Sequence, residues 1–217
     1  MTAGSVSTPA KGRQRVNRGS EAIRSRLVES ALSEFAARGF GGASTRSIAS
    51  RAQAHQPQIN YHFESKDELW RACLELLLAE LDAAITERTQ NVDSDDQMGT
   101  FEAIIRGLVT FASRRPELNR IMMHEGTEPS ERLSWLVTTH LQWRFDDLRI
   151  RWEELTATAT VAPLRGELLY HVLLGAACLL YANAPEASLL GLQPNDDSAV
   201  AAHADSLVAM FLGTSGP

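Results

Sequence analysis

The side chains best suited to a chemical task lie between Thr45 and Lys66, in the stretch TRSIASRAQAHQPQINYHFESK. Three amides, Gln56, Gln58 and Asn60, alternate along its middle part. A side-chain amide donates and accepts hydrogen bonds on one edge, which is the pattern that reads base edges in the DNA major groove. We therefore expect this stretch to contact DNA.

Two short helices joined by a tight turn would position these amides, one over about 45–52 and the other over about 56–62. Thr45 can cap the first helix through its hydroxyl, and small apolar residues give that helix a buried face. Gln53 lies in a turn too short for anything but a corner between helices. The second helix has one large apolar anchor, Ile59, and is otherwise mostly polar. This pattern predicts a helix-turn-helix, whose second helix enters the groove.

The flanking sequence predicts two more helices. Apolar residues at spacings of three and four over about 20–38 indicate an amphipathic helix that ends at Gly39. Ser65 begins another helix, and Glu68, three residues later, completes a capping box. That helix should reach about Thr89 and link a small module to the rest of the chain.

The charge distribution supports a DNA-binding module at the amino-terminal end. The net charge of −6 argues, taken alone, against a nucleic-acid partner. Residues 1–66 nevertheless hold ten Lys or Arg and four Asp or Glu, a net charge of +6 against −12 for the remainder. Only the basic part is therefore expected to contact phosphate. Residues 1–18 should form a disordered basic arm, which either reaches the DNA or stays solvated.

Beyond the module the chain reads as helical throughout. No alternation typical of β-strands has useful length, so we predict an all-α protein with a helix-turn-helix domain at 19–65 and a larger helical region at 66–217. Helices are expected over about 98–114, 116–126, 129–158, 163–183 and 198–212, with Pro185 ending the fourth of these.

Several classes of protein are disfavoured. Cys73 and Cys178 lie in apolar helical runs and are expected as buried free thiols in preference to a redox pair or disulfide. No His, Cys or acidic cluster has metal-ligand spacing, so neither a metal nor a cofactor is predicted. The longest apolar stretch, 168–182, is shorter than the roughly 20 residues of a membrane span. We predict a soluble, cytoplasmic protein without a membrane partner.

Three motifs, in order and in register, point to a family. They are Ala31-x-x-Glu34-Phe35-Ala36-x-x-Gly39-Phe40, then Thr45-x-x-Ile48-Ala49-x-x-Ala52, then Ile59-x-Tyr61-His62-Phe63-x-Ser65-Lys66-Asp67-x-Leu69. Over about residues 20–75 the chain resembles the tetracycline-repressor (TetR/AcrR) family of transcriptional regulators. The resemblance implies a homodimer that binds an operator through one three-helix domain per subunit. It also implies a carboxy-terminal domain that binds a small effector and dimerises through its last two long helices.

The resemblance and the chemistry together give the expected DNA contacts. Gln56 can bond adenine bidentately, Arg46 can bond guanine, and Pro57 can pack on a thymine methyl. The predicted base-reading residues are Arg46, Gln56, Pro57, Gln58 and Asn60, and the predicted phosphate contacts are Thr45, Tyr61, His62 and Lys66. The alternatives are that Tyr61 packs beside Phe63, and that Gln58 and Asn60 are merely solvated.

Two positions depart from the family pattern. Asn60 stands where many members have tyrosine, which replaces a larger DNA contact with a short amide. Gln53 stands where the turn usually has glycine. If this position requires a positive φ, glutamine is strained there by about 1 kcal/mol.

The expected effector site and dimer interface lie on the carboxy-terminal helices. The pocket candidates are Phe101, Ile105, Met122, Met123, Trp135, Thr139, His140, Trp143, Tyr170, His171 and Leu174. The interface candidates are Val172, Gly175, Ala176, Leu179, Val200, Ala204, Leu207, Val208 and Phe211. For both sets the alternative is that the apolar side chains form the subunit's own core.

These expectations combine into a functional prediction. We predict a repressor that binds a pseudo-palindromic operator as a homodimer and is released by a small, largely apolar effector. One alternative is a structural DNA-binding protein without an effector. The other is an enzyme in the helical body, which is weaker because the chain has neither HExxH nor GxSxG.

Overall fold

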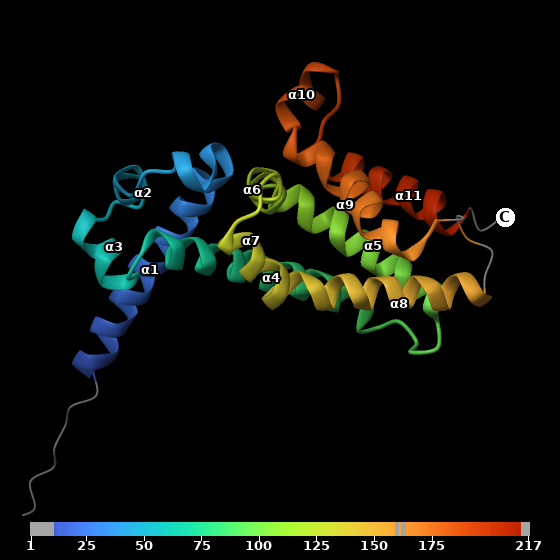
Figure 1. Ribbon diagram of the computed structural model, residues 1–217, viewed down its shortest axis with the longest axis horizontal. Coiled ribbons are helices and arrows are strands. Elements are labelled where there is room, and N and C mark those ends of the chain that lie inside the picture. The colour runs from blue at the N-terminus through green and yellow to red at the C-terminus, as the bar shows by residue number, and fades with distance from the viewer. Residues whose placement is uncertain (1–10, 159–160, 162–163, 214–217) are drawn as a thin grey trace, which may run out of the picture. The chain divides into compact units, whose positions relative to one another are not determined.

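The computed structural model describes residues 11–158, 161 and 164–213, with the backbone alone from Lys11 to Arg18 (Figure 1). The elements are α1 (Lys11–Gly42), α2 (Thr45–Arg51), α3 (Gln56–His62), α4 (Lys66–Thr89), α5 (Gln97–Arg114), α6 (Glu117–Glu125), α7 (Glu131–Leu136), the π-helix η1 (Val137–Leu141), α8 (Gln142–Thr158), α9 (Gly166–Ala182), α10 (Ala184–Leu189) and α11 (Asp197–Leu212). No β-strand occurs among the described residues. The predicted all-α fold is confirmed.

The chain divides into two compact units, Met1–Cys73 and Leu74–Pro217. The division falls inside α4, further along the chain than the predicted boundary before Lys66. The reason is that the first turns of α4 complete the core of the first unit, where Leu69, Trp70 and Cys73 are fully buried. The Cys73 thiol lies 3.6 Å from the backbone carbonyl of Val28 on α1.

Helix α1 buries an apolar face in the first unit, including Leu27, Ala31 and Phe35. Gly39 has φ +65° and breaks the regular helix, as its predicted terminal position requires, before one further turn to Gly42. The helix begins at Lys11, earlier than predicted. Residues 11–18, which were predicted to be disordered, therefore have a helical backbone, in keeping with a sequence that lacks proline and has several good helix formers. Residues 1–10 of the predicted arm lie outside the described residues.

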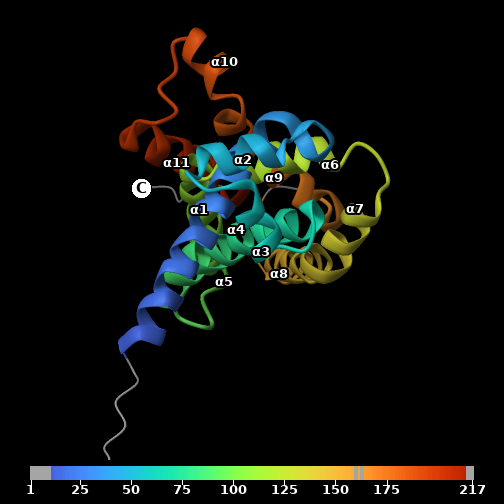
Figure 2. The ribbon, with the colours of Figure 1, turned by 90° about the vertical axis from the view of Figure 1, so that its left-hand side faces the viewer.

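Helices α2 and α3 form the tight corner that the sequence predicts (Figure 2). Ile48 of α2 and Ile59 of α3 are both buried in the core of the first unit. Each helix therefore has a single large apolar anchor, and its other face is free for polar side chains.

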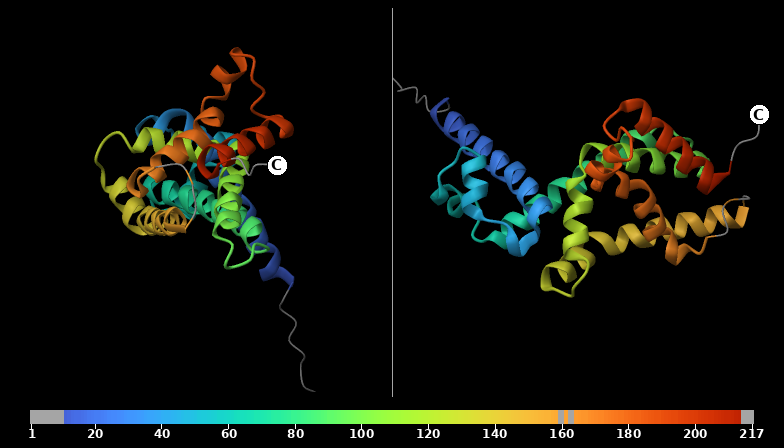
Figure 3. Two further views of the ribbon diagram at one scale, coloured as in Figure 1. Left: turned by 90° about the vertical axis from the view of Figure 1, so that its right-hand side faces the viewer. Right: turned by 90° about the horizontal axis from the view of Figure 1, so that it is seen from above.

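In the second unit α5 lies at the centre, packed against α11, α9 and α8 (Figure 3). Helix α7, η1 and α8 form one continuous run from Glu131 to Thr158, close to the predicted 129–158. Helix α9 ends at Ala182, three residues before Pro185 and close to the predicted end. Pro185 lies in the first turn of α10, a helix that the sequence analysis missed. Proline fits there because the first amides of a helix have no intrahelical partner.

Both cysteines are free thiols in buried positions, as predicted. Burial raises the pKa of the Cys178 thiol to about 12, so it remains protonated. Within the described part of the chain, no helix combines the length and the apolar character that crossing a membrane requires.

Candidate functional site

The start of α2 is held by Ser44, whose side chain accepts a hydrogen bond from the Ser47 amide at 3.4 Å. This corrects the prediction that Thr45 is the cap. Thr45 is instead the first residue of the helix, and its hydroxyl accepts a hydrogen bond from the Gln56 side-chain amide at 3.0 Å. Two of the predicted DNA contacts are therefore bonded to each other across the helix-turn-helix.

The start of α3 uses a second predicted DNA contact for a structural task. The side-chain oxygen of Gln58 accepts a hydrogen bond from the His55 amide at 2.8 Å, which satisfies a donor at the helix start. Pro57 occupies the first turn, as expected. Gln58 thus contributes to the cap of α3, whereas Gln56 lies exposed in the first turn of the same helix.

The outer face of the helix-turn-helix is polar and accessible. Arg46, Gln56, Pro57 and Asn60 are exposed, and the Tyr61 ring is 78% exposed, so it does not pack as a core residue. His62 is half-buried. Its pKa is lowered from the ordinary 6.5 by burial and, to a smaller extent, by the nearby Arg24 charge.

Lys66 lies at the first turn of α4, where it was predicted to meet phosphate. Ser65 accepts a hydrogen bond from the Glu68 amide at 3.0 Å, which confirms the predicted cap, and the Glu68 carboxylate accepts from the Glu64 amide at 2.6 Å. The Lys66 ammonium sits 4.7 Å above the Phe40 ring centroid. This contact places the cation at the start of a helix, an arrangement suited to an anion.

A buried carboxylate that the sequence analysis did not assign connects α1 to α2. Glu34 is only 1% exposed. It accepts hydrogen bonds from the Ser44 amide at 3.4 Å and the Ser47 hydroxyl at 3.1 Å. It also pairs with Arg38 at 3.4 Å and Arg51 at 3.6 Å. The signal for it in the sequence was an acidic residue beside the apolar stripe of α1.

The turn between α2 and α3 has the positive φ at Gln53 that the sequence analysis considered. Its φ is +52°, in the left-handed region that glycine favours, and Gln53 is the non-glycine residue found there among those described. The Gln53 amide donates to the Ser50 carbonyl at 3.1 Å, and the Ala54 amide donates to the Ala49 carbonyl at 2.9 Å. These bonds close the corner around a strained residue.

The second unit contains a large cavity of about 1170 Å³. Its walls come from α4, α5, α6, the run from α7 to α8, and α9. Six of the eleven predicted pocket residues line it: Met122, Met123, Trp143, Tyr170, His171 and Leu174. Helix α4 contributes Leu78, Leu81 and Ile85, which the sequence analysis had not placed in a pocket.

The other five predicted pocket residues do not line the cavity. Phe101 and Ile105 belong to the core, and the Phe101 ring centroid lies 5.0 Å from that of Trp152. Trp135 and His140 pack on each other with centroids 5.0 Å apart, and Thr139 is exposed. The reason is helical phase, because neighbouring positions on the same helices face the cavity instead.

Charged groups at the cavity wall are paired across helices. Arg144 of α8 donates to both carboxylate oxygens of Asp82 on α4, from Nε at 3.1 Å and from Nη2, and its Nη1 donates to the His140 carbonyl. Arg115 pairs with Glu80 at 2.7 Å. Arg144 therefore ties the π-helix η1 to α4.

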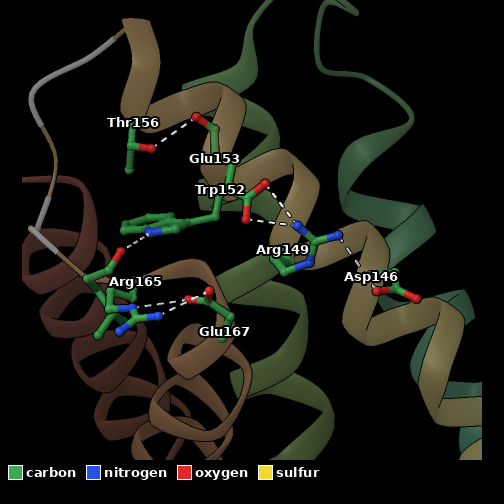
Figure 4. A network of polar contacts seen from close by, with 8 residues as sticks. Asp146, Arg149, Trp152, Glu153, Thr156, Arg165 and Glu167 are labelled. Atoms are coloured by element: carbon green, nitrogen blue, oxygen red, sulfur yellow. Dashed lines mark hydrogen bonds and ion pairs between the residues drawn. The ribbon is translucent and has the colours of Figure 1, made fainter.

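The far end of α8 is fastened to the segment that leads into α9 (Figure 4). The buried Trp152 indole donates to the Leu164 carbonyl at 2.8 Å. Arg149 bonds both oxygens of Glu153, at 2.9 and 3.0 Å, on the outside of the helix. These contacts hold the long wall of the cavity in place.

The predicted interface residues fall into two groups. On α9, Val172, Gly175 and Leu179 are exposed, and Ala176 is half-buried. On α11, Val200 and Val208 are half-buried, whereas Ala204, Leu207 and Phe211 are buried within the subunit itself. This corrects the prediction at those three positions, because α11 packs its apolar face on α5.

Between α9 and α11 lies a polar bridge that the sequence analysis had left unassigned. One ring nitrogen of His203 lies 3.0 Å from the Ala176 carbonyl, and the other lies 3.0 Å from the Tyr181 hydroxyl. The neutral imidazole suits this arrangement, with a donor at the carbonyl and an acceptor at the phenol. Burial lowers the pKa of His203, which favours the same neutral form.

A three-helix module with an exposed polar third helix, followed by a larger all-helical unit with a cavity, is typical of helix-turn-helix regulators. Residues 27–73 match the family model described as "Bacterial regulatory proteins, tetR family". The resemblance predicted from the sequence is confirmed, and the amino-terminal unit is a helix-turn-helix domain of the tetR family.

Relatives agree with this assignment. The chain is 33% identical over 108 residues to the HTH-type transcriptional repressor SCO4008 of Streptomyces coelicolor. The matched segment spans 50% of this chain and 52% of that repressor, about half the length of each.

Solved structures share the fold at low sequence identity. AibR in complex with isovaleryl coenzyme A and operator DNA aligns over 88% of this chain and 98% of its own, with a TM-score of 0.71 at 16% identity. HlyIIR, a hemolysin II transcriptional regulator, aligns over 86% of this chain and 97% of its own, with a TM-score of 0.64 at 15% identity.

Proposed function

We propose that the protein is a ligand-responsive transcriptional repressor that binds a pseudo-palindromic operator as a homodimer. The observation that carries the proposal is the presence of two different recognition surfaces on one chain. The first unit exposes a polar helix beside a fixed cation, and the second contains a partly open cavity of about 1170 Å³. The matched Streptomyces relative is a transcriptional repressor, which supports the choice of a repressor.

The proposed DNA contacts keep the division made from the sequence. Arg46, Gln56, Pro57 and Asn60 would read bases, and Thr45, Tyr61, His62 and Lys66 would meet phosphate. Gln58 stays in the base-reading set, but its cap bond to the His55 amide leaves only its side-chain NH₂ group for a base. Gln56 would exchange its bond to Thr45 for a bond to a base, so DNA binding would release both partners.

The proposed dimer would use α9 and α11. Leu168, Val172 and Leu179 expose apolar side chains at helical spacing on α9, and Gly175 between them presents no side chain. Met210 is 63% exposed on α11. A twofold pair of such helices would separate the two reading helices by a fixed distance, and half-sites should then lie about one turn of DNA apart, roughly 34–36 Å, or somewhat more.

Helix α4 would carry the signal between the two surfaces. Lys66 begins it, and residues from Leu78 to Thr89 line the cavity. A ligand that favours one packing of the cavity walls would shift α4 and change the spacing of the reading helices. Such coupling is reciprocal, so operator DNA must lower ligand affinity by the same factor by which ligand lowers operator affinity.

Selection of binding sites from random DNA with the full-length protein tests the proposal. We expect a pseudo-palindrome, bound by two subunits, with affinity that falls steeply as salt rises. Equal affinity for all sequences would contradict a specific regulator. Sedimentation of the DNA-free protein at micromolar concentration gives an independent test, and a 23.8 kDa species alone would contradict the dimer.

A further inference from the structure

The cavity of the second unit is bounded mainly by hydrocarbon. Its walls carry leucine, isoleucine, methionine and aromatic side chains from five helices, such as Leu81, Ile104, Phe111 and Trp143. A volume of about 1170 Å³ exceeds the range of roughly 300–1,000 Å³ that suits drug-sized molecules. The cavity therefore has room for a long chain or a polycyclic skeleton.

The charges at this wall are already neutralised by the protein. Arg144 is bonded to Asp82, Arg151 to Asp147 at 2.8 Å, and Arg115 to Glu80 at 2.7 Å. An anionic ligand would have to compete with a carboxylate for each guanidinium. A cationic ligand would likewise have to compete with an arginine for Asp82 and for Asp147. Moving an ion out of water is costly unless such a partner is available.

The wall also carries neutral polar side chains, and the most buried of the ring-bearing ones is Tyr170. The Tyr170 hydroxyl lines the cavity and forms no hydrogen bond with any residue that the structure describes. Its ring packs on Phe145 with centroids 5.7 Å apart, which fixes its direction. Burial raises the pKa of Tyr170, so the phenol stays neutral and keeps its proton as a donor.

We propose that the cavity binds an uncharged, largely hydrocarbon molecule whose single hydroxyl or carbonyl group bonds the Tyr170 hydroxyl. The paired arginines select against charge, and the tyrosine supplies one point of polar recognition. This inference rests on the proposed function in one respect only, namely that the occupant is also the effector.

Three probes with the same ten-carbon chain separate the possibilities: 1-decanol, decanoate and decyltrimethylammonium. Their affinities for the full-length protein can be measured by quenching of tryptophan fluorescence, since Trp143 lies at the wall. We expect 1-decanol to bind at least about tenfold more tightly than either ion. Equal or tighter binding of decanoate or of the ammonium probe would overturn the proposal.

Two substitutions test the polar contacts directly. Tyr170→Phe should weaken 1-decanol binding by about twofold to tenfold, in line with the loss of one neutral hydrogen bond. Tyr61→Phe is the matched control, because Tyr61 is exposed in the other unit. Asp82→Asn should raise decanoate affinity by about twofold to fivefold, since it leaves Arg144 without its carboxylate. No loss with Tyr170→Phe would remove the assigned role of the phenol.

A parallel assay of operator binding keeps this inference separate from the proposed function. If 1-decanol binds with the expected preference but leaves operator affinity unchanged, the cavity chemistry stands and the effector role fails. If decanoate binds more tightly and also releases the operator, the regulatory role stands and the inference about charge is wrong.

Discussion

The two proposed recognition surfaces are built in different ways. The first presents polar groups on a short helix, where Gln58 is held by the His55 amide close in the chain and Gln56 by the Thr45 hydroxyl of the preceding helix. The second forms a concave apolar surface whose charges are paired over long stretches of chain, such as Arg144 with Asp82. Contacts within the helix-turn-helix are enough to position the proposed DNA-reading side chains, whereas the cavity needs several helices that are distant in the chain.

The largest effect expected in the first unit comes from removing its one buried carboxylate. Glu34→Ala leaves the Ser44 amide and the Ser47 hydroxyl without an acceptor and opens a cavity, so we expect the free energy of unfolding to fall by about 3 kcal/mol. Thermal or urea denaturation measures this loss. Glu34→Gln is the control, because it retains an acceptor and should lose less. An unchanged stability in Glu34→Ala would show that local bonds do not hold this site.

Substitutions of the two glutamines of α3 should change different properties, namely DNA binding for Gln56 and stability for Gln58. Gln56→Ala should cost about 1–3 kcal/mol on the cognate site and relax the sequence preference, without a matching loss of fold stability. Gln58→Ala should mainly lower the free energy of unfolding, by about 1 kcal/mol, because it removes a cap bond. Binding to cognate and random DNA, together with denaturation of each variant, resolves the pair. If the two variants lose the same DNA affinity and the same free energy of unfolding, the separate roles of base contact and helix cap are contradicted.

The strained turn gives a gain of stability. Gln53→Gly should raise the free energy of unfolding by about 1 kcal/mol, because glycine adopts a φ of +52° without a steric penalty. Ser50→Gly, at an exposed helical position of α2, should instead lower stability by about 0.5–1 kcal/mol. If both variants lose stability, the strain of the left-handed conformation is not the dominant contribution to the free energy of this turn.

The smallest and most gradual effect expected is a dependence of stability on pH. The pKa values of His62, His140 and His203 are all lowered from 6.5, and burial is the largest cause for each. The folded protein therefore binds fewer protons than the unfolded chain near and below pH 6.5. Stability is fully present above that pH and falls as the pH drops through the lower folded values.

Denaturation between pH 7.5 and 5.5 measures this slope. His203→Gln, which takes the histidine of the bridge between α9 and α11 out of the titration, should flatten it. A stability that rises on acidification would contradict the lowered pKa values.

The sequence predicted the first unit more accurately than the cavity of the second unit, and the reason is physical. The first unit depends on caps, a glycine end and a tight corner, which are signals within a few residues, and even the positive φ at Gln53 could be anticipated. The cavity depends on which face each helix turns inward. Neighbouring apolar positions such as Ile104 and Ile105 have the same composition, yet only the first lines the cavity. That choice is made by packing between distant helices.

The same limit explains the interface positions on α11. Its apolar stripe at Ala204, Leu207 and Phe211 was compatible with a partner subunit or with the subunit's own core. Packing on α5 makes it core, and Phe211 also meets Trp152 with ring centroids 6.3 Å apart. Glu34 was overlooked for a related reason. Its structural role depends on contacts with the start of α2, which composition alone does not reveal.

The π-helix η1 makes the facing of the cavity wall sensitive to the deletion of a single residue. A π turn holds one more residue than an α turn, and Val137–Leu141 adds that residue in the middle of the run from α7 to α8. Loss of a single codon there would restore the regular helix and rotate one side of the run by about 100° relative to the other. Since Trp152 anchors the far end of α8, the rotation would fall on Leu133 and its neighbours. A single deletion can therefore change which side chains face the cavity while every remaining residue keeps its identity.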